Sequence, residues 1–299
     1  KTHLQGKSLL KNTKLNKGTA FTKEERDTFK ISGMLPEIVQ TIEEQMSFVY
    51  YQFKEKKTNL QKNIFLNGLH DNNETLFYAL VLNNLEEMLP IIYTPTVGEA
   101  VEKFSLELRR YRGLYISYQN IDQIDEIIQH RSNPTVKLIV VTDGEGVLGI
   151  GDQGIGSMKI SIAKLMVYTL CAGIDPNIVL PIQLDVGTNN ETLLNDHKYL
   201  GWRHKRITGE QYDIFIDKFI TGVTKEFPNV YLHWEDFGRE NARKNLNRYK
   251  NSMCTFNDDM QGTGLVALAC ILAGLKATKR DLKDQVVVIY GAGTAGVGV

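Results

Sequence analysis

The chain contains few cysteines and has no excess of either charge. Its three cysteines among 299 residues are widely separated: Cys171, Cys254 and Cys270. An odd, scattered set in apolar surroundings favours reduced, buried thiols in a reducing compartment such as the cytoplasm over a disulfide framework or a zinc site. Lys+Arg and Asp+Glu are equal at 35 each. The chain therefore has no overall field that would favour nucleic acid or an anionic membrane as a partner.

Long apolar runs are also absent from the sequence. No run approaches the ~18 residues of a membrane span, and no signal-peptide core stands near the start, so we expect no membrane insertion. Residues 1–17 carry five lysines and no acid. Such a charge run favours a solvated, mobile arm over a targeting or phosphate-binding segment. The 42% hydrophobic and 23% charged content is that of a soluble globular protein, long enough for two domains.

The spacing of apolar residues changes near residue 130. Before it, segments such as PEIVQTIEEQMSFVYYQF place apolar residues three and four apart, as amphipathic helices do. After it, the runs VKLIVV, IVLPIQL, NVYLHW, MCTF and QVVVIY alternate with helical segments. This alternation predicts an α/β fold with a mostly parallel sheet buried on both faces. We expect a helical N-terminal region at residues 1–130, an α/β domain at 131–278 and a further domain beginning at 279–299.

Acidic residues follow four of the expected strands. They are Asp143, Asp185, the doublet Glu235–Asp236 and the doublet Asp258–Asp259. Ligands of open α/β sheets bind beyond the carboxyl ends of the strands, so these acids are expected to form one acidic cleft. Converging carboxylates resist ionisation, whereas Mg²⁺ or Mn²⁺ accepts carboxylate oxygens and leaves positions open for water or substrate. A shared metal site and solvated surface acids both remain open interpretations.

Two further residues stand out by their surroundings. Lys164 is the single charge in ISIAKLMVYTLCAGI, a segment apolar nearly all round and therefore expected to be a buried helix. A buried lysine can act as a general base near neutral pH; alternatively, its stem lies along the core and its amine reaches water or a carboxylate. Tyr93, between two prolines in PIIYTPTVG, is either a core tyrosine or a proton donor at the cleft.

A glycine-rich motif ends the chain. In VVVIYGAGTAGVGV, Gly291, Gly293 and Gly296 fit G-x-G-x-x-G after an expected strand and at the start of an expected helix. This context indicates dinucleotide binding, with a pyrophosphate on the helix N-terminus. We therefore expect the first strand of a Rossmann domain whose remainder lies beyond Val299. The residue that distinguishes NAD from NADP would lie ~20 residues further on, so this choice stays open.

In combination, these segments resemble the malic enzymes. The likeness runs from about Asn16 to Val299 through NKGTAFT, YTPTVG, TDGEGVLGIGDQG, LDVGTNN, EDFG, CTFNDDMQGT and GAGTAG. The resemblance implies a helical region, an α/β substrate- and metal-binding domain and a dinucleotide-binding domain. It also implies oxidative decarboxylation of L-malate to pyruvate and CO₂ with NAD or NADP and Mg²⁺ or Mn²⁺, in a homodimer or homotetramer.

The resemblance further implies roles for the residues named above. Lys164 falls on the general base, Tyr93 on the general acid and Asp258 on a carboxylate near the base. The implied metal ligands are Glu235, Asp236 and Asp259. The implied cofactor-binding positions are Gly146, Asp259, Gly291, Gly293 and Gly296.

The chain departs from the family at the segment TDGEG. Malic enzymes usually read TDGER there, with an arginine that contacts the substrate carboxylate or the cofactor; Gly146 takes its place. Losing this clamp should weaken malate binding unless another cation replaces it. Lys159 is a candidate replacement, although a solvated lysine is the simpler interpretation.

Gly146 also indicates an alternative reaction. Malolactic enzymes carry a glycine at this position, and VYLHWEDFGRENA is similar to them as well. These relatives convert malate to lactate and CO₂ while NAD stays bound. We therefore expect a malic enzyme, with a malolactic enzyme as the alternative and a catalytically inactive metal-binding or assembly fragment as a third hypothesis.

Overall fold

The computed structural model describes residues 2–107, 110–131 and 135–299. The chain divides into two compact units. The helical unit comprises Lys1–Ala100, Leu108–Arg110 and Leu170–Ala172, and the sheet unit comprises Val101–Glu107, Tyr111–Thr169 and Gly173–Val299.

The helical unit is built from short helices with strong N-terminal caps. Its helices are α1 (Gly6–Leu10), α2 (Lys23–Thr28), α3 (Ile42–Lys54), α4 (Asn59–Asn72), α5 (Glu74–Asn83), α6 (Leu85–Ile92) and most of α7 (Thr96–Glu102). Three of them begin with a capping box, in which a threonine and a Glu or Gln three residues later each accept from the other's backbone N–H. The pairs are Thr22–Glu25, Thr41–Glu44 and Thr58–Gln61.

The lysine-rich start of the chain is folded. Leu9 on α1 packs with Phe21 and Ile31 in a buried apolar cluster. The expectation of a solvated, mobile arm was therefore wrong: the apolar residues between the lysines are enough to anchor the segment.

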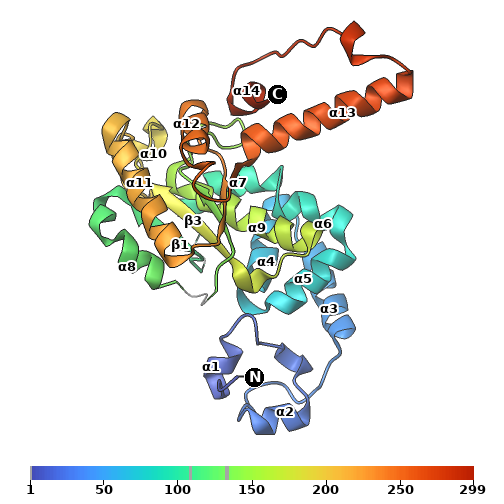
Figure 1. Cartoon of the computed structure of the whole chain (residues 1–299). Coiled ribbons are helices and arrows are strands. Elements are labelled where there is room, and N and C mark those ends of the chain that lie inside the picture. Colours follow the sequence, from blue (N-terminus) through green and yellow to red (C-terminus); the bar gives the residue numbers. More distant parts are fainter. Residues whose placement is uncertain (1, 108–109, 132–134) are drawn as a thin grey trace. The chain divides into compact units, whose positions relative to one another are not determined.

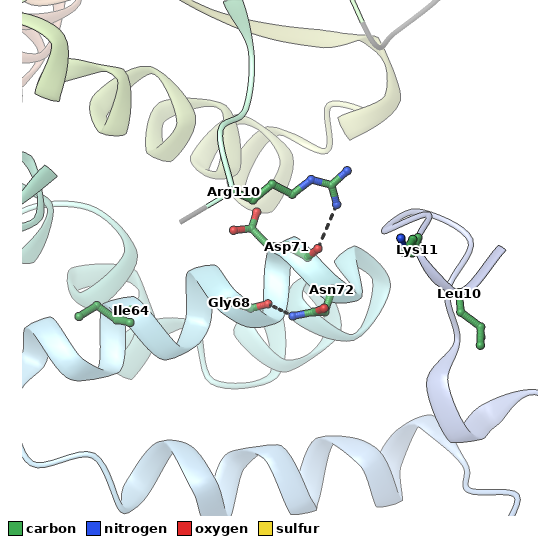
Figure 2. Close-up of a pocket in the computed structure, with 7 residues that line it drawn as sticks. All are labelled: Leu10, Lys11, Ile64, Gly68, Asp71, Asn72 and Arg110. Carbon is green, nitrogen blue, oxygen red and sulfur yellow. Dashed lines mark hydrogen bonds between the residues drawn. The ribbon is translucent and has the colours of Figure 1, made fainter. Parts of the chain in front are cut away.

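A surface pocket of about 540 Å³ lies in the helical unit between the end of α4 and the segment that follows α1 (Figure 2). Arg110 donates to the carbonyl of Asp71 at 3.3 Å, and Asn72 donates to the carbonyl of Gly68 at 2.7 Å. The side chains of Lys11, Asn72 and Arg110 are exposed, so the pocket is an open depression.

The sheet unit contains five parallel strands with helices on both faces (Figure 1). In the order β1-β3-β2-β4-β5 the strands are Leu114–Ser117, Val179–Asp185, Leu138–Thr142, Tyr231–Trp234 and Thr255–Asn257. The helices are α8 (Ile124–Gln129), α9 (Met158–Ala172), α10 (Glu191–Asn195), α11 (Gly209–Glu226), α12 (Arg239–Tyr249), α13 (Thr263–Thr278) and α14 (Thr294–Gly298).

Strand β2 shows why the sheet is covered on both faces. All five of its residues are buried. Because side chains alternate along a strand, Ile139 and Val141 pack in the cluster that includes α8 and α11, whereas Leu138 and Val140 pack against Leu165 of α9. The α/β class and the parallel sheet predicted from the sequence are confirmed.

Two details of the predicted sheet were wrong. Strand β1 was not predicted, although it pairs with β3 in parallel register from Leu114 to Ser117. Residues 286–290 were expected to form the first Rossmann strand, but they form neither strand nor helix, with Val286 91% and Val288 82% exposed. A β-rich segment needs a neighbouring strand to complete its hydrogen bonds, and the described residues place none beside 286–290.

The cysteines are exposed, contrary to expectation. Cys171 lies in the last turn of α9, Cys254 precedes the edge strand β5, and Cys270 lies on α13, every residue of which is at least partly exposed. Apolar neighbours in the sequence therefore did not predict burial of these three thiols correctly.

Two helical stretches reach the length and hydropathy of a membrane span, which no uninterrupted apolar run in the sequence had suggested. They are Gly154–Ala172, 61% buried over its most apolar window, and Asp258–Thr278, 6% buried. The first is a core helix of this chain. Length and composition alone are weak evidence for a membrane span.

Candidate active site

The carboxyl ends of the five parallel strands lie at one edge of the sheet, and acidic residues gather there as predicted. Asp185 ends β3, Asp143 follows β2, and the two acidic doublets follow β4 and β5. The acids fall into two groups with different surroundings. One group surrounds a buried arginine, and the other surrounds Lys164.

Arg206 organises the first group. Its Nε donates to Asp152 Oδ2 at 2.7 Å, and its Nη2 donates to the carbonyl of Asp143 at 2.6 Å. The Asp143 carboxyl accepts from the Tyr212 hydroxyl at 2.8 Å, and Asp185 accepts from the backbone N–H of Trp202 at 2.7 Å. These groups are paired and buried, so the prediction that all the strand ends form one acidic cleft was wrong.

Lys164 lies at the centre of the second group. Its Nζ is 2.9 Å from Glu235 Oε1 and 2.8 Å from Asp258 Oδ2, with the lysine side chain 13% exposed. Helix α9 supplies the lysine, and the segments that follow β4 and β5 supply the two carboxylates. The buried-helix prediction for this segment is confirmed, and the amine reaches carboxylates.

Asp236 has an unusual backbone and a buried side chain. Strand β4 ends at Trp234, and Asp236 has a left-handed φ of 57°. The chain has therefore left the strand, as the sequence required if both acids of the doublet were to face one target. The N–H of Asp236 donates to Asp259 Oδ2 at 2.8 Å. Asp236 Oδ2 is buried and has no hydrogen-bond partner in the part of the chain that the structure describes.

The three acids influence one another's ionisation. Burial raises the pKa of Asp236 well above its usual value, and the carboxyls of Glu235 and Asp259 raise it further. Burial, followed by Glu235, raises the pKa of Asp259 to about 7. Burial acts to raise the pKa of Glu235 as well, but His233 and Lys164 outweigh it and hold that pKa below its usual value. The site thus holds more buried carboxyls than one lysine neutralises, a donor set that suits a divalent cation.

A second grouping of possible metal ligands shares Glu235. One ligand atom from each of His233, Glu235 and Asp258 lies within 4.8 Å of the others, so these residues could hold a metal ion. His233 was not singled out from the sequence. Its position on β4, two residues before Glu235 and so on the same side of the extended chain, was the available signal.

Tyr93 belongs to the helical unit, directly after α6. Its backbone N–H donates to the carbonyl of Leu89 at 3.0 Å, its carbonyl accepts from Val97 at 2.8 Å, and its side chain is half-buried. The catalytic part assigned to Tyr93 stays a prediction.

Gly146 lies against the backbone of Asp236 and Phe237, just after β4. Its N–H donates to the carbonyl of Asp236 at 2.9 Å. Its φ is outside the left-handed region, and an added Cβ would lie 3.1 Å from the carbonyl oxygen of Phe237. The φ angle therefore does not require a glycine, but a side chain would need the Phe237 carbonyl to shift by a few tenths of an ångström.

Lys159 is buried rather than solvated, contrary to the simpler expectation. Its Nζ lies 5.6 Å from the centre of the Phe104 ring. Five residues along a helix rotate a side chain by roughly 140° about the axis, so Lys159 and Lys164 leave α9 on different sides.

The glycine motif opens a helix, as predicted. Gly293 is the N-cap of α14, which begins at Thr294, and Gly291 has a positive φ of 118°. The preceding residues are not a strand, so one element of the expected dinucleotide-binding context is missing from the structure.

The fold and this site define an α/β domain with a lysine–carboxylate site at the carboxyl edge of a parallel sheet. Residues 70–250 match the family described as "Malic enzyme, N-terminal domain", and residues 260–299, which include α13, match "Malic enzyme, NAD binding domain". The chain belongs to the malic enzyme family.

Two bacterial enzymes illustrate the similarity. NAD-dependent malic enzymes of Sodalis glossinidius and Proteus mirabilis are each 54% identical over 294 residues, covering 98% of this chain and 52% of theirs. The chain thus spans about half the length of these relatives. A solved NAD-dependent malic enzyme from Thermotoga maritima is 22% identical and covers 70% of this chain and 44% of its own, with a TM-score of 0.41.

Proposed function

We propose that this chain carries the substrate- and metal-binding part of an NAD-dependent malic enzyme, which converts L-malate to pyruvate and CO₂. The observation that carries the proposal is the position of Lys164. Its Nζ lies within 2.9 Å of two carboxylates, beside the buried Asp236 and the half-buried Asp259. The relatives' names and their 54% identity support the choice of reaction and of NAD over NADP.

The proposed metal ligands are Glu235, Asp236 and Asp259, for Mg²⁺ or Mn²⁺. The buried Oδ2 of Asp236 without a hydrogen-bond partner among the described residues supports this set. Between Glu235 and Asp258, by contrast, the Lys164 amine already supplies a positive charge. A divalent cation bound here would supply Lewis-acid stabilisation of the charge that develops on the substrate oxygens.

Lys164 is the proposed general base. Paired with the two carboxylates it is an ammonium, so it must first pass its own proton on; the neutral amine would then accept the proton of the malate 2-hydroxyl. NAD, when bound, would supply the hydride acceptor. Glu235 and Asp258 hold that amine from two sides, which fixes its direction before substrate arrives. Tyr93 is proposed to return a proton to the substrate carbon after CO₂ leaves.

The remaining assignments rest on the family. We propose that Gly146, Asp259 and the glycines Gly291, Gly293 and Gly296 face the cofactor, with residues 131–278 as the substrate- and metal-binding domain. Malate as the substrate, a homodimer or homotetramer, and a cytoplasmic location complete the proposal.

A malolactic reaction is the second candidate, favoured by Gly146 at the position of the family's arginine. The two reactions share their residues and differ in their products. Full-length protein with L-malate, Mn²⁺ and NAD should give pyruvate and NADH in equal amounts. Lactate without net NADH would establish the malolactic alternative, and Mn²⁺ binding without malate consumption would favour a catalytically inactive metal-binding protein.

A further inference from the structure

Helix α9 contacts strand β4 and the residue that follows it through two side-chain pairs. Lys164 contacts Glu235 at 2.9 Å, and the Tyr168 hydroxyl lies 2.8 Å from His233 Nδ1. Four residues of helix advance about 6 Å, and two residues of strand advance about 6.6 Å, so the two pairs match in spacing. A helix face and a strand face are thereby joined in register, and one of the two pairs contains the proposed base.

His233 is held on every side. It is 1% exposed, and its Nε2 lies 2.5 Å from Glu235 Oε2. The rings of Tyr168 and Phe256 pack edge-to-face against it, with centroids at 5.7 and 5.6 Å. Because a carboxylate only accepts hydrogen bonds, Nε2 is the donor to Glu235, and Nδ1 is left to the Tyr168 hydroxyl.

These contacts of His233 restrain the carboxylate of Glu235. Its Oε2 is fixed by His233, so its Oε1 is directed to Lys164. A carboxylate without the histidine would be able to rotate about its terminal bond, whose torsional preference is broad. Histidine and tyrosine together therefore restrain the orientation of the acid that touches the base.

We propose that His233, itself fixed by Tyr168, is a positioning residue for Glu235. It orients this carboxylate toward the cation and toward Lys164. The inference rests on the proposed function. His233 as a direct metal ligand is the competing role, since its ligand atom lies within 4.8 Å of those of Glu235 and Asp258. The structure disfavours that role because both ring nitrogens already have partners, at 2.5 and 2.8 Å.

The test uses three variants of the full-length protein. His233→Leu removes both hydrogen bonds, Tyr168→Phe removes one hydroxyl, and His233→Gln keeps an amide donor for Glu235 and an acceptor for Tyr168. Mn²⁺ affinity is measured from the spin-resonance signal of the free ion, alongside kcat, KM for malate and thermal unfolding. We expect His233→Leu to weaken Mn²⁺ binding by about 10–100-fold, the range for outer-shell partners of metal ligands, with Tyr168→Phe weakened less and His233→Gln largely restored.

Tyr249→Phe is the matched control, since the Tyr249 hydroxyl bonds Asp217 in the same unit without touching the site. It should leave Mn²⁺ affinity unchanged. Unchanged Mn²⁺ affinity in His233→Leu and Tyr168→Phe, with only the unfolding temperature lowered, would overturn the inference. If His233→Leu does not fold, Tyr168→Phe alone decides by the same criterion.

Pulsed spin resonance of bound Mn²⁺ separates the two roles of His233. We expect no nitrogen coupling to the ion, and coupling that disappears in His233→Gln would overturn the inference in favour of direct ligation. Wild-type protein that neither binds Mn²⁺ nor consumes malate would refute the proposed function, and the inference with it. Mn²⁺-dependent turnover that is insensitive to His233 and Tyr168 would refute this inference alone.

Discussion

Lys164 donates a 2.8 Å hydrogen bond to Asp258 across 94 residues of chain. The contact joins the middle of the buried helix α9 to the residue that follows the edge strand β5. With Glu235 on its other side, the amine is held between the ends of two neighbouring strands. This arrangement places a group that can move a proton among buried and half-buried acids.

Replacing Lys164 tests the proposed base. In the full-length protein Lys164→Ala should lower kcat by roughly 10²–10⁴, the usual range for a general base, with little loss of Mn²⁺ affinity. Steady-state kinetics and a Mn²⁺ titration check both parts. Lys225→Ala is the control, because Lys225 pairs with Asp125 at 2.6 Å on the exposed surface of the same unit. Near wild-type kcat in Lys164→Ala would show that the assigned role is wrong.

Asp236→Asn should affect stability and metal binding in opposite directions. The substitution removes a buried carboxyl whose Oδ2 has no hydrogen-bond partner in the described residues, and asparagine tolerates the left-handed φ of 57°. We expect metal-free protein to gain about 1–3 kcal/mol in its free energy of unfolding, while Mn²⁺ affinity falls at least about tenfold. Urea unfolding in EDTA and a Mn²⁺ titration measure the two effects.

Asp185→Asn is the matched comparison for Asp236. Its carboxylate is also buried, but it accepts from the N–H groups of Trp202 at 2.7 Å and Gly187 at 3.3 Å. An amide there loses an acceptor, so unfolding should become easier by about 1–3 kcal/mol. If both substitutions changed the free energy of unfolding in EDTA in the same direction, this would contradict the view that the neighbouring carboxyls destabilise Asp236.

Gly146→Arg tests whether the missing arginine limits malate binding. The backbone accepts a side chain, but the Cβ lies 3.1 Å from the carbonyl oxygen of Phe237, so a small steric cost is expected. Gly146→Ala isolates that cost. Relative to alanine, the arginine variant should lower KM for malate by roughly tenfold, since a charge-assisted hydrogen bond contributes about 1.5–3 kcal/mol. Equal KM values in the two variants would show that the guanidinium does not reach the substrate.

The sequence predicted the α/β class because short hydrophobic runs, most of them followed by acids, alternate with helical segments. It missed β1 (Leu114–Ser117) because this strand lies within residues 1–130, where the apolar spacing predicted helices, and because its pairing with β3 is non-local. It predicted a strand at residues 286–290 because Val and Ile favour strands, but a strand also needs a neighbouring strand to pair with.

The candidate site was foreseen in part for similar reasons. Local spacing located the acids, and an apolar helix made Lys164 conspicuous. Spacing could not show that Asp143 would be paired with Arg206 and Tyr212, because these partners lie 63 and 69 residues away. The pairing of Tyr168 with His233, 65 residues apart, was equally invisible before the helix and strand were placed side by side.

Asp143 should make folding stability depend on pH. Burial raises its pKa from 3.8 to about 6, with Arg206 acting in the opposite direction. The folded state therefore holds a proton that the unfolded state releases between about pH 4 and pH 6. The stability linked to this group is fully present below about pH 4 and is lost as pH rises through 6. The loss amounts to about 3 kcal/mol, at roughly 1.4 kcal/mol per pH unit.

Asp143→Asn removes this titration while leaving an oxygen to accept from Tyr212. Urea unfolding of both proteins from pH 4 to pH 7, in EDTA, gives the difference in their free energies of unfolding. That difference should shift by about 3 kcal/mol in favour of the variant as pH rises. Asp213→Asn, which alters an aspartate bonded to Lys244 near the surface, is the control for loss of a carboxylate elsewhere in the same unit. A difference between wild type and Asp143→Asn that stays constant from pH 4 to pH 7 would mean that the buried carboxyl is ionised throughout, with Arg206 outweighing its burial.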